Sequence, residues 1–88
     1  MLRIRNKAQA GTMQSSDLMV FVEPSNTLHV EIESTVQKQY EHLIRECVDG
    51  VLRRMNLSRG RVIVSDRGAL DYAIEARVET AVRRGLDT

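Results

Sequence analysis

Ser15 is the residue of this chain that most clearly suggests chemistry, because it stands among small and polar residues directly before an apolar segment. The stretch around it reads Gly11-Thr12-Met13-Gln14-Ser15-Ser16-Asp17-Leu18. A serine hydroxyl is a weak nucleophile unless a base activates it. It can still be the point at which another enzyme attaches a group, since that enzyme supplies the activation. Taken alone, such a stretch is more often an ordinary polar turn.

The other reactive side chains do not indicate a catalytic or metal-binding site. Cys47 follows the apolar positions of a helical pattern and is expected to fill the core. His29 and His42 fall on polar faces without a ligand-spaced partner, so we expect no metal site. Asp66 and Asp71 are expected to cap a turn or the start of a helix. We therefore assign no catalytic residue.

Composition favours one small folded domain and argues against several classes of protein. Apolar residues make up 42% and charged residues 28% of the 88 positions, as in folded soluble domains. A net charge of +1, with two Tyr and one Phe, lacks the features of a nucleic-acid binder. The single cysteine excludes an internal disulfide. No membrane-spanning run or secretory signal is recognisable, so we expect a cytoplasmic protein without membrane contact.

Hydrophobic periodicity predicts the order ββαβα. Residues 18–23 and 28–33 alternate as strands and are expected to pair as a β-hairpin around Pro24-Ser25-Asn26. Ser34-x-x-Gln37 resembles a capping box and predicts that a long helix begins at Ser34. Its apolar stripe consists of Val36, Tyr40, Leu43, Ile44, Cys47, Val48, Val51, Leu52 and Met55. A strand at 61–65, a turn at 66–68 and a helix at 70–84 follow, and this helix is expected to bury Leu70, Ile74, Val78, Ala81 and Val82.

These elements predict an α+β fold with two layers. The sheet is expected to be three-stranded and mixed, with residues 18–23 between the other two strands and both helices on one face. Residues 1–14 have weak periodicity and are expected to form a flexible N-terminal arm. Residues 15–88 are then the single folded domain.

Two separated blocks of the sequence resemble the acyl carrier subunit, or gamma chain, of citrate lyase. The first is the stretch around Ser15, which is similar to that family's attachment motif Gly-Thr-x-x-Ser-(Ser or Gly)-Asp-(aliphatic) and leads directly into a strand. The second combines Val62-Ile63-Val64 with Gly68-Ala69-Leu70-Asp71 and Ala76-Arg77-Val78. The two blocks occur in the right order and cover most of the chain, which makes a chance match a poor explanation.

The resemblance implies that Ser15, three residues after Thr12 and two before Asp17, carries a phosphoribosyl dephospho-coenzyme A group through a phosphodiester. Ser16 is the alternative attachment point. Gly11 would supply backbone freedom, and Asp17 would either orient the attaching transferase or begin the strand. Conventional acyl carrier proteins differ, since their attachment serine begins a helix on an acidic scaffold.

The resemblance also implies a role and partners. Residues 15–88 would be an acyl carrier domain whose attached thiol holds acetyl or citryl as a thioester. An alpha subunit would exchange acetyl for citrate and release acetate, and a beta subunit would cleave the citryl thioester to oxaloacetate. A prosthetic-group transferase would load the chain. Two alternatives remain: the carrier of citramalate lyase or malonate decarboxylase, and an unmodified α+β interaction domain. A further hypothesis places Arg3, Arg5 and Lys7 near the phosphates of the attached group.

Overall fold

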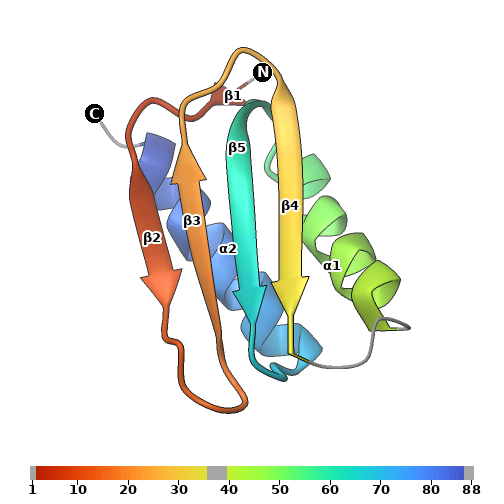
Figure 1. Cartoon of the computed structure of the whole chain (residues 1–88). Helices are drawn as coiled ribbons and strands as arrows, with labels where there is room; N and C mark the ends of the chain where they lie inside the picture. Colours follow the sequence, from red (N-terminus) through yellow and green to blue (C-terminus); the bar gives the residue numbers. More distant parts are fainter. Residues whose placement is uncertain (1, 36–39, 87–88) are drawn as a thin grey trace.

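In a computed structural model, which describes residues 2–35 and 40–86, the chain forms one mixed sheet and two helices (Figure 1). In chain order the elements are β1 (Leu2–Arg3), β2 (Ala8–Gly11), β3 (Leu18–Glu23), β4 (Leu28–Ser34), α1 (Glu41–Arg54), β5 (Leu57–Asp66) and α2 (Asp71–Leu86). The predicted α+β class and the mixed sheet are confirmed. The predicted number of strands is wrong, because the described residues form five strands instead of three.

β5 is the central strand of the sheet, because it pairs along both of its edges. β3 pairs with it antiparallel, from Leu18 opposite Asp66 to Glu23 opposite Arg61. β4 pairs with it in parallel, and the short β1 pairs in parallel with its first residues. β2 is added antiparallel to the other edge of β3. β5 therefore connects three other strands and holds the sheet together.

The expected hairpin of residues 18–23 with 28–33 is wrong, and so is the expected strand order, since β5 lies between β3 and β4. Burial explains this order. Val62 and Val64 of β5 and Val20 of β3 are fully buried, whereas β4 has no fully buried residue. The run Val62-Ile63-Val64 has no polar residue in alternation, which is typical of a strand inside a sheet. β5, whose inward-facing valines are fully buried, thus lies between β3 and β4.

The N-terminal segment is part of the sheet, so the prediction of a flexible arm at residues 1–14 is wrong for the described residues. Ile4 and Ala10 are 2% and 4% exposed and belong to the core. The side chain of Ile4 lies against Gly60 and Gly85, which have no side chains of their own to fill that space. Arg5 N also donates to the carbonyl of Gly85 at 2.9 Å. The domain therefore includes this segment and does not begin at Ser15.

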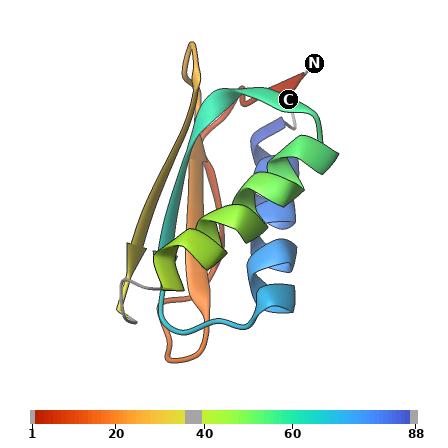
Figure 2. The same ribbon diagram turned by 90° about the vertical axis from the view of Figure 1, so that its right-hand side faces the viewer.

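Both helices cover the same face of the sheet, as predicted (Figure 2). α1 begins at Glu41, so the prediction of a helix start at Ser34 is wrong. Ser34 is the last residue of β4, and its hydroxyl donates to Asp66 Oδ2 at 3.0 Å. Gln37, the other half of the expected capping box, and Val36 lie outside the described residues. The serine satisfies a buried carboxylate across the sheet and is not a helix cap.

The helical stripes are confirmed except near the helix starts. Tyr40 and Leu43 are about half exposed, at 47% and 50%, and Leu70 is 63% exposed and precedes α2. Cys47 packs against the core as expected, and its partial burial raises the pKa of its thiol. Neither helix is long and apolar enough to cross a membrane. Among the predicted stripe residues, those buried in the core are Ile44, Val48, Val51, Leu52, Ile74, Val78, Ala81 and Val82.

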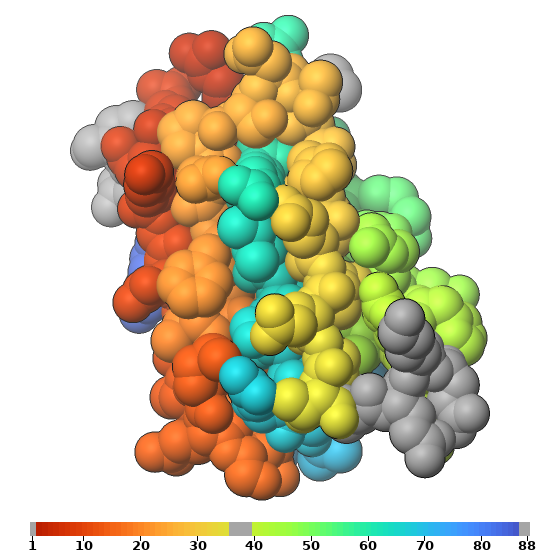
Figure 3. Space-filling view, viewed as in Figure 1, coloured from red at the N-terminus to blue at the C-terminus, as the bar shows by residue number. Residues whose placement is uncertain are grey.

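Among the described residues, no other element covers the face of the sheet opposite the helices (Figure 3). On it, Arg61 bridges Glu23 and Glu31 on the neighbouring strands, which lowers the pKa of Glu31. The two outer strands receive arginines from the helix layer. Arg45 of α1 donates to the carbonyl of Val30 in β4 at 3.3 Å, and Arg84 of α2 donates to the carbonyl of Gln9 in β2 at 2.7 Å.

Candidate functional site

Ser15 lies at the tip of the loop that joins β2 to β3, at one end of the sheet (Figure 1). The main-chain N–H of Asp17 donates to the carbonyl of Gln14 at 3.2 Å, which closes a β-turn with Ser15 and Ser16 at its centre. Ser15 is exposed, and its hydroxyl makes no hydrogen bond within the described residues. The loop therefore presents a free hydroxyl on the outside of a closed turn.

Ser16 adopts a left-handed backbone conformation, with φ of +65°. A positive φ at the third residue is the mark of a type II turn, where glycine is preferred. The attachment motif of the citrate lyase carriers has either Ser or Gly at this position, and the positive φ explains why glycine is accepted there. The N–H of Ser16 also donates to the carbonyl of Arg67 at 2.8 Å, which ties the inner side of the turn to the end of β5.

A glycine is required at position 11 because β2 and β3 lie very close together there. The expected reason, backbone freedom for a flexible N-terminal arm, is wrong. The φ of Gly11 is +103°, and a Cβ at this position would lie 1.9 Å from the carbonyl oxygen of Leu18. Thr12 N donates to that same oxygen at 3.0 Å. The glycine thus allows β2 and β3 to close the base of the Ser15 loop.

Asp17 is the anchor of the loop. Its carboxylate accepts hydrogen bonds from Thr12 Oγ1 at 2.6 Å and from the N–H of Leu18 at 2.8 Å. Arg77 of α2 donates to the same carboxylate through Nε at 3.2 Å and Nη2 at 3.0 Å. These donors, with that of Thr12 first in importance, lower the pKa of Asp17 to about 2. The structure therefore favours the structural role of Asp17, which holds both ends of the loop against a helix.

Arg77 is a site residue that sequence analysis missed. It stood in the second block of the family resemblance, and its position there was the available signal. The ion pair with Asp17 spans 60 residues and joins the two blocks physically. Thr12 and Asp17 of the first block and Arg77 of the second thus support the Ser15 turn together.

Replacing Asp17 with asparagine is expected to lower the free energy of unfolding at pH 7 by about 1 to 2 kcal/mol. The folded pKa of about 2 lies below the usual aspartate pKa of 3.8. The stabilisation is therefore complete above about pH 5 and is lost as the pH falls through 3.8 toward 2. Urea unfolding at pH 7 and at pH 2.5 measures this loss. Glu79→Gln, which breaks the exposed pair with Arg83, is the control and should cost less than about 0.5 kcal/mol. An equal difference between wild type and Asp17→Asn at the two pH values would contradict the ion-pair role.

The loop between β5 and α2 lies beside the Ser15 turn. Asp66 is 2% exposed, and its carboxylate accepts hydrogen bonds from the N–H groups of Gly68 and Ala69 at 3.1 and 3.0 Å. Gly68 has φ of +94°, which confirms the tight turn expected there. The Nε of Arg67 is buried without a hydrogen-bond partner among the described residues. Arg67 also has no carboxylate partner within the same residues, so it adds an uncompensated positive charge near the turn.

This site can present a hydroxyl but has no means of activating it. The part of the chain that the structure describes contains no group of three His, Cys, Asp or Glu residues arranged to hold a metal ion. Within the described residues no histidine is hydrogen-bonded to Ser15, and the carboxylate of Asp17 is engaged with Thr12, Leu18 and Arg77. An external enzyme would have to supply the base for any reaction at Ser15. A phosphodiester formed with the Ser15 hydroxyl would extend into solvent, since Ser15 is exposed and its hydroxyl makes no hydrogen bond within the described residues, so the residues present fit such a group.

Comparisons with known proteins find a matching family model, similar sequences and a solved structure with the same fold. Residues 5–85 match the family model described as malonate decarboxylase delta subunit. A citrate lyase acyl carrier protein of Haemophilus influenzae is 43% identical over 98% of this chain and 90% of its own length. One of Pectobacterium atrosepticum is 44% identical over 98% of this chain and 91% of its own length. A chain of a Pseudomonas malonate decarboxylase hetero-tetramer has the same fold, with a TM-score of 0.80 at 19% identity, over 94% of this chain and 87% of that chain.

Proposed function

The chain belongs to the acyl carrier family that the malonate decarboxylase delta subunit and the citrate lyase acyl carrier proteins represent, and we propose that it is the acyl carrier subunit of a citrate lyase. In this proposal Ser15 bears a phosphoribosyl dephospho-coenzyme A group through a phosphodiester. The observation that carries it is the exposed Ser15 hydroxyl, held outward on a turn that Thr12, Asp17 and Arg77 fix in place.

The attached group would supply the thiol that carries the acyl unit, while the protein supplies position. Ser15 holds the group at the outer end of the sheet, away from the packed face. The Asp17–Arg77 pair keeps the base of the loop on α2. Because a hydrogen bond closes the turn, Ser15 stays exposed and in place. The attached group, and not the loop, would then move between the active sites of the partner subunits. Tethering raises the local concentration of thioester at the active sites of the partner subunits.

The proposed partners are a citrate lyase alpha subunit, which transfers the acyl group, a beta subunit, which cleaves the citryl thioester, and a prosthetic-group transferase. Identity of 43–44% to two citrate lyase acyl carrier proteins supports these partners. The carrier of malonate decarboxylase is the second candidate. It is supported by the description of the matching family model and by the shared fold with a chain of the malonate decarboxylase complex.

Intact-mass measurement tests the attachment. The chain is produced together with the attachment enzymes of a citrate lyase system, and a mass increase equal to the proposed group is expected. A chain that keeps its unmodified mass, under conditions that load a known citrate lyase carrier, would contradict the proposal. The loaded chain is then assayed with citrate lyase alpha and beta subunits and, separately, with malonate decarboxylase subunits. Activity with only the malonate decarboxylase subunits would favour the second candidate.

A further inference from the structure

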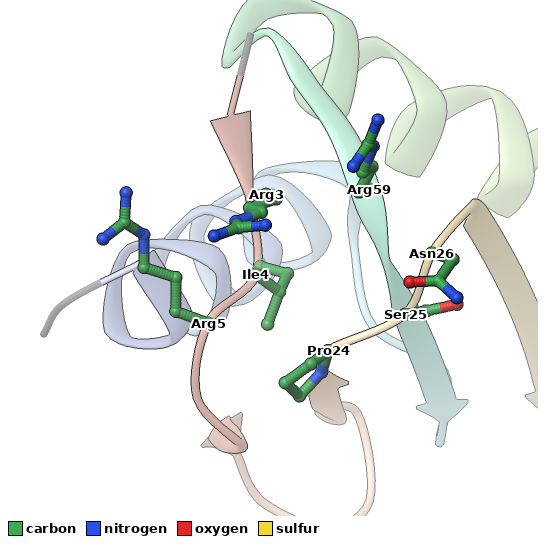
Figure 4. Close-up of a pocket in the computed structure, with 7 residues that line it drawn as sticks. All are labelled: Arg3, Ile4, Arg5, Pro24, Ser25, Asn26 and Arg59. Atoms are coloured by element: carbon green, nitrogen blue, oxygen red, sulfur yellow. The ribbon is translucent and has the colours of Figure 1, made fainter.

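Three arginines gather at the end of the sheet opposite Ser15. Arg3 and Arg5 flank the buried Ile4, and Arg59 lies on β5, where its carbonyl accepts a hydrogen bond from Ile4 N at 2.9 Å. Together with the loop of residues 24–26 they line an open hollow of about 660 Å³, which we call the arginine hollow (Figure 4). The side chains of Ser25 and Asn26 add polar groups to its wall. The hollow is thus built from segments that are distant in the sequence.

The three guanidinium groups of the hollow are unpaired. None of them has a hydrogen-bond acceptor or a carboxylate partner within residues 2–35 and 40–86, and no acidic residue lines the hollow. By contrast, Arg61 is paired with Glu23, Arg77 with Asp17 and Arg83 with Glu79. All three arginines of the hollow are exposed. Although the net charge of the chain is only +1, positive charge is concentrated at the hollow, and no ion pair within the described residues neutralises it.

The arrangement of these groups indicates the shape of what they bind. In Figure 4 the three guanidinium groups lie in a row across the hollow and do not point at a common centre. A single phosphate is bound best by donors that converge on it, whereas a row of arginines fits several carboxylates spread over a surface. We propose that the arginine hollow is the docking site for an acidic surface of the partner subunits, one that presents several Asp or Glu side chains. This inference rests on the proposed carrier function.

The position of the hollow suits a carrier. β3 starts beside the Ser15 loop and ends at the hollow, and its six residues span about 20 Å. A partner bound at the arginine end leaves the Ser15 end free to present its attached group to different active sites. The sequence suggested that Arg3 and Arg5 lie near the phosphates of that group. In the structure these arginines lie at the opposite end of the sheet from Ser15, too far away to contact phosphates close to it. Docking and attachment are thereby separated along one strand.

Charge-reversal variants test the docking site. Arg5→Glu and Arg59→Glu are compared with Arg83→Glu, which changes the charge equally on an exposed face of α2. The affinity of each variant for the assembled citrate lyase alpha and beta subunits is measured at low and at moderate salt. We expect Arg5→Glu and Arg59→Glu to bind about tenfold more weakly at low salt, with a smaller salt dependence, while Arg83→Glu stays within about twofold of wild type. All three should still acquire the Ser15 adduct, since the hollow is remote from that loop. If a reversal unfolds the chain, Arg5→Gln and Arg59→Gln take its place, with a smaller loss expected.

The outcomes separate this inference from the proposed function. If wild type is loaded and assembles but both hollow variants bind as wild type does, the docking site is wrong while the carrier function stands. Equal weakening in Arg83→Glu would mean that only total charge matters, and would also overturn the site. A hexaglutamate peptide is expected to compete with assembly better than inorganic pyrophosphate does, and the reverse order would identify a phosphate site instead. A wild-type chain that is neither loaded nor assembled contradicts the proposed function, and the inference fails with it.

Discussion

The Ser15→Ala variant is expected to lose the covalent adduct completely, while Ser16→Gly keeps it. Both hydroxyls are exposed on the same turn, so exposure alone does not distinguish them. Ser15 is the outer residue with a free hydroxyl, whereas the main chain of Ser16 is hydrogen-bonded to Arg67 and has a positive φ. The mass of the intact chain, after production with the attachment enzymes, gives the fraction modified.

The choice of glycine at position 16 makes the control clean. Alanine in a left-handed conformation costs about 1 kcal/mol or more relative to glycine, so Ser16→Ala would change the turn as well as remove the hydroxyl. Ser16→Gly removes the hydroxyl and suits the φ of +65°. An adduct that persists in Ser15→Ala and disappears in Ser16→Gly would move the attachment to Ser16. Fragmentation of the modified peptide of wild type assigns the position independently.

Gly11→Ala is expected to destabilise the fold by about 3 kcal/mol or more, a large share of the stability of a small domain. A methyl group would overlap the carbonyl of Leu18 at 1.9 Å, and the φ of +103° disfavours any side chain. Since the clashing atom belongs to the backbone, it cannot move without breaking the pairing of β2 with β3. The urea midpoint of unfolding, followed by far-ultraviolet circular dichroism, measures the effect.

Gly50→Ala is the matched control, because it makes the same chemical change elsewhere in the chain. Gly50 lies inside α1, and a Cβ there would meet no atom within 4 Å. Alanine should therefore stabilise the protein by about 0.5 to 1 kcal/mol through helix propensity. The two substitutions are thus expected to have opposite signs. A Gly11→Ala variant as stable as wild type would mean that the loop base is not closed as described.

The sequence predicts which segments form helices and strands better than it predicts which strands lie side by side. The alternation at residues 18–23 and 28–33 and the helical stripe from Ile44 to Leu52 follow from local periodicity, and they are confirmed. Which strand lies between which others depends on pairing between distant segments, which periodicity does not contain. The run Val62-Ile63-Val64 is the one local feature that indicates a central strand. Ile4 belongs to the core only because Gly60 and Gly85 leave room for it.

The candidate site shows the same division between local and distant information. The position of Ser15 relative to Thr12 and Asp17 is local and was available from the sequence. The hydrogen bond from Thr12 to Asp17 and the ion pair from Arg77 required the folded chain. The predicted order ββαβα likewise gave no indication that Arg3, Arg5 and Arg59 would line one hollow. A functional motif within one segment can be predicted from the sequence, whereas a surface formed by several distant segments cannot.

The arginines on the outer strands have a consequence for the behaviour of the protein at high concentration. An outer strand with unpaired carbonyl and N–H groups is a template on which a strand of another molecule can add, and such addition begins aggregation. Arg45 donates a hydrogen bond to a carbonyl of β4, and Arg84 donates one to a carbonyl of β2. An incoming strand would need such carbonyls as free acceptors, so a bound arginine at each edge of the sheet hinders its addition. Loss of both arginines would leave two open templates on a domain with a small core. The helix layer thus protects the sheet at its margins as well as covering one of its faces.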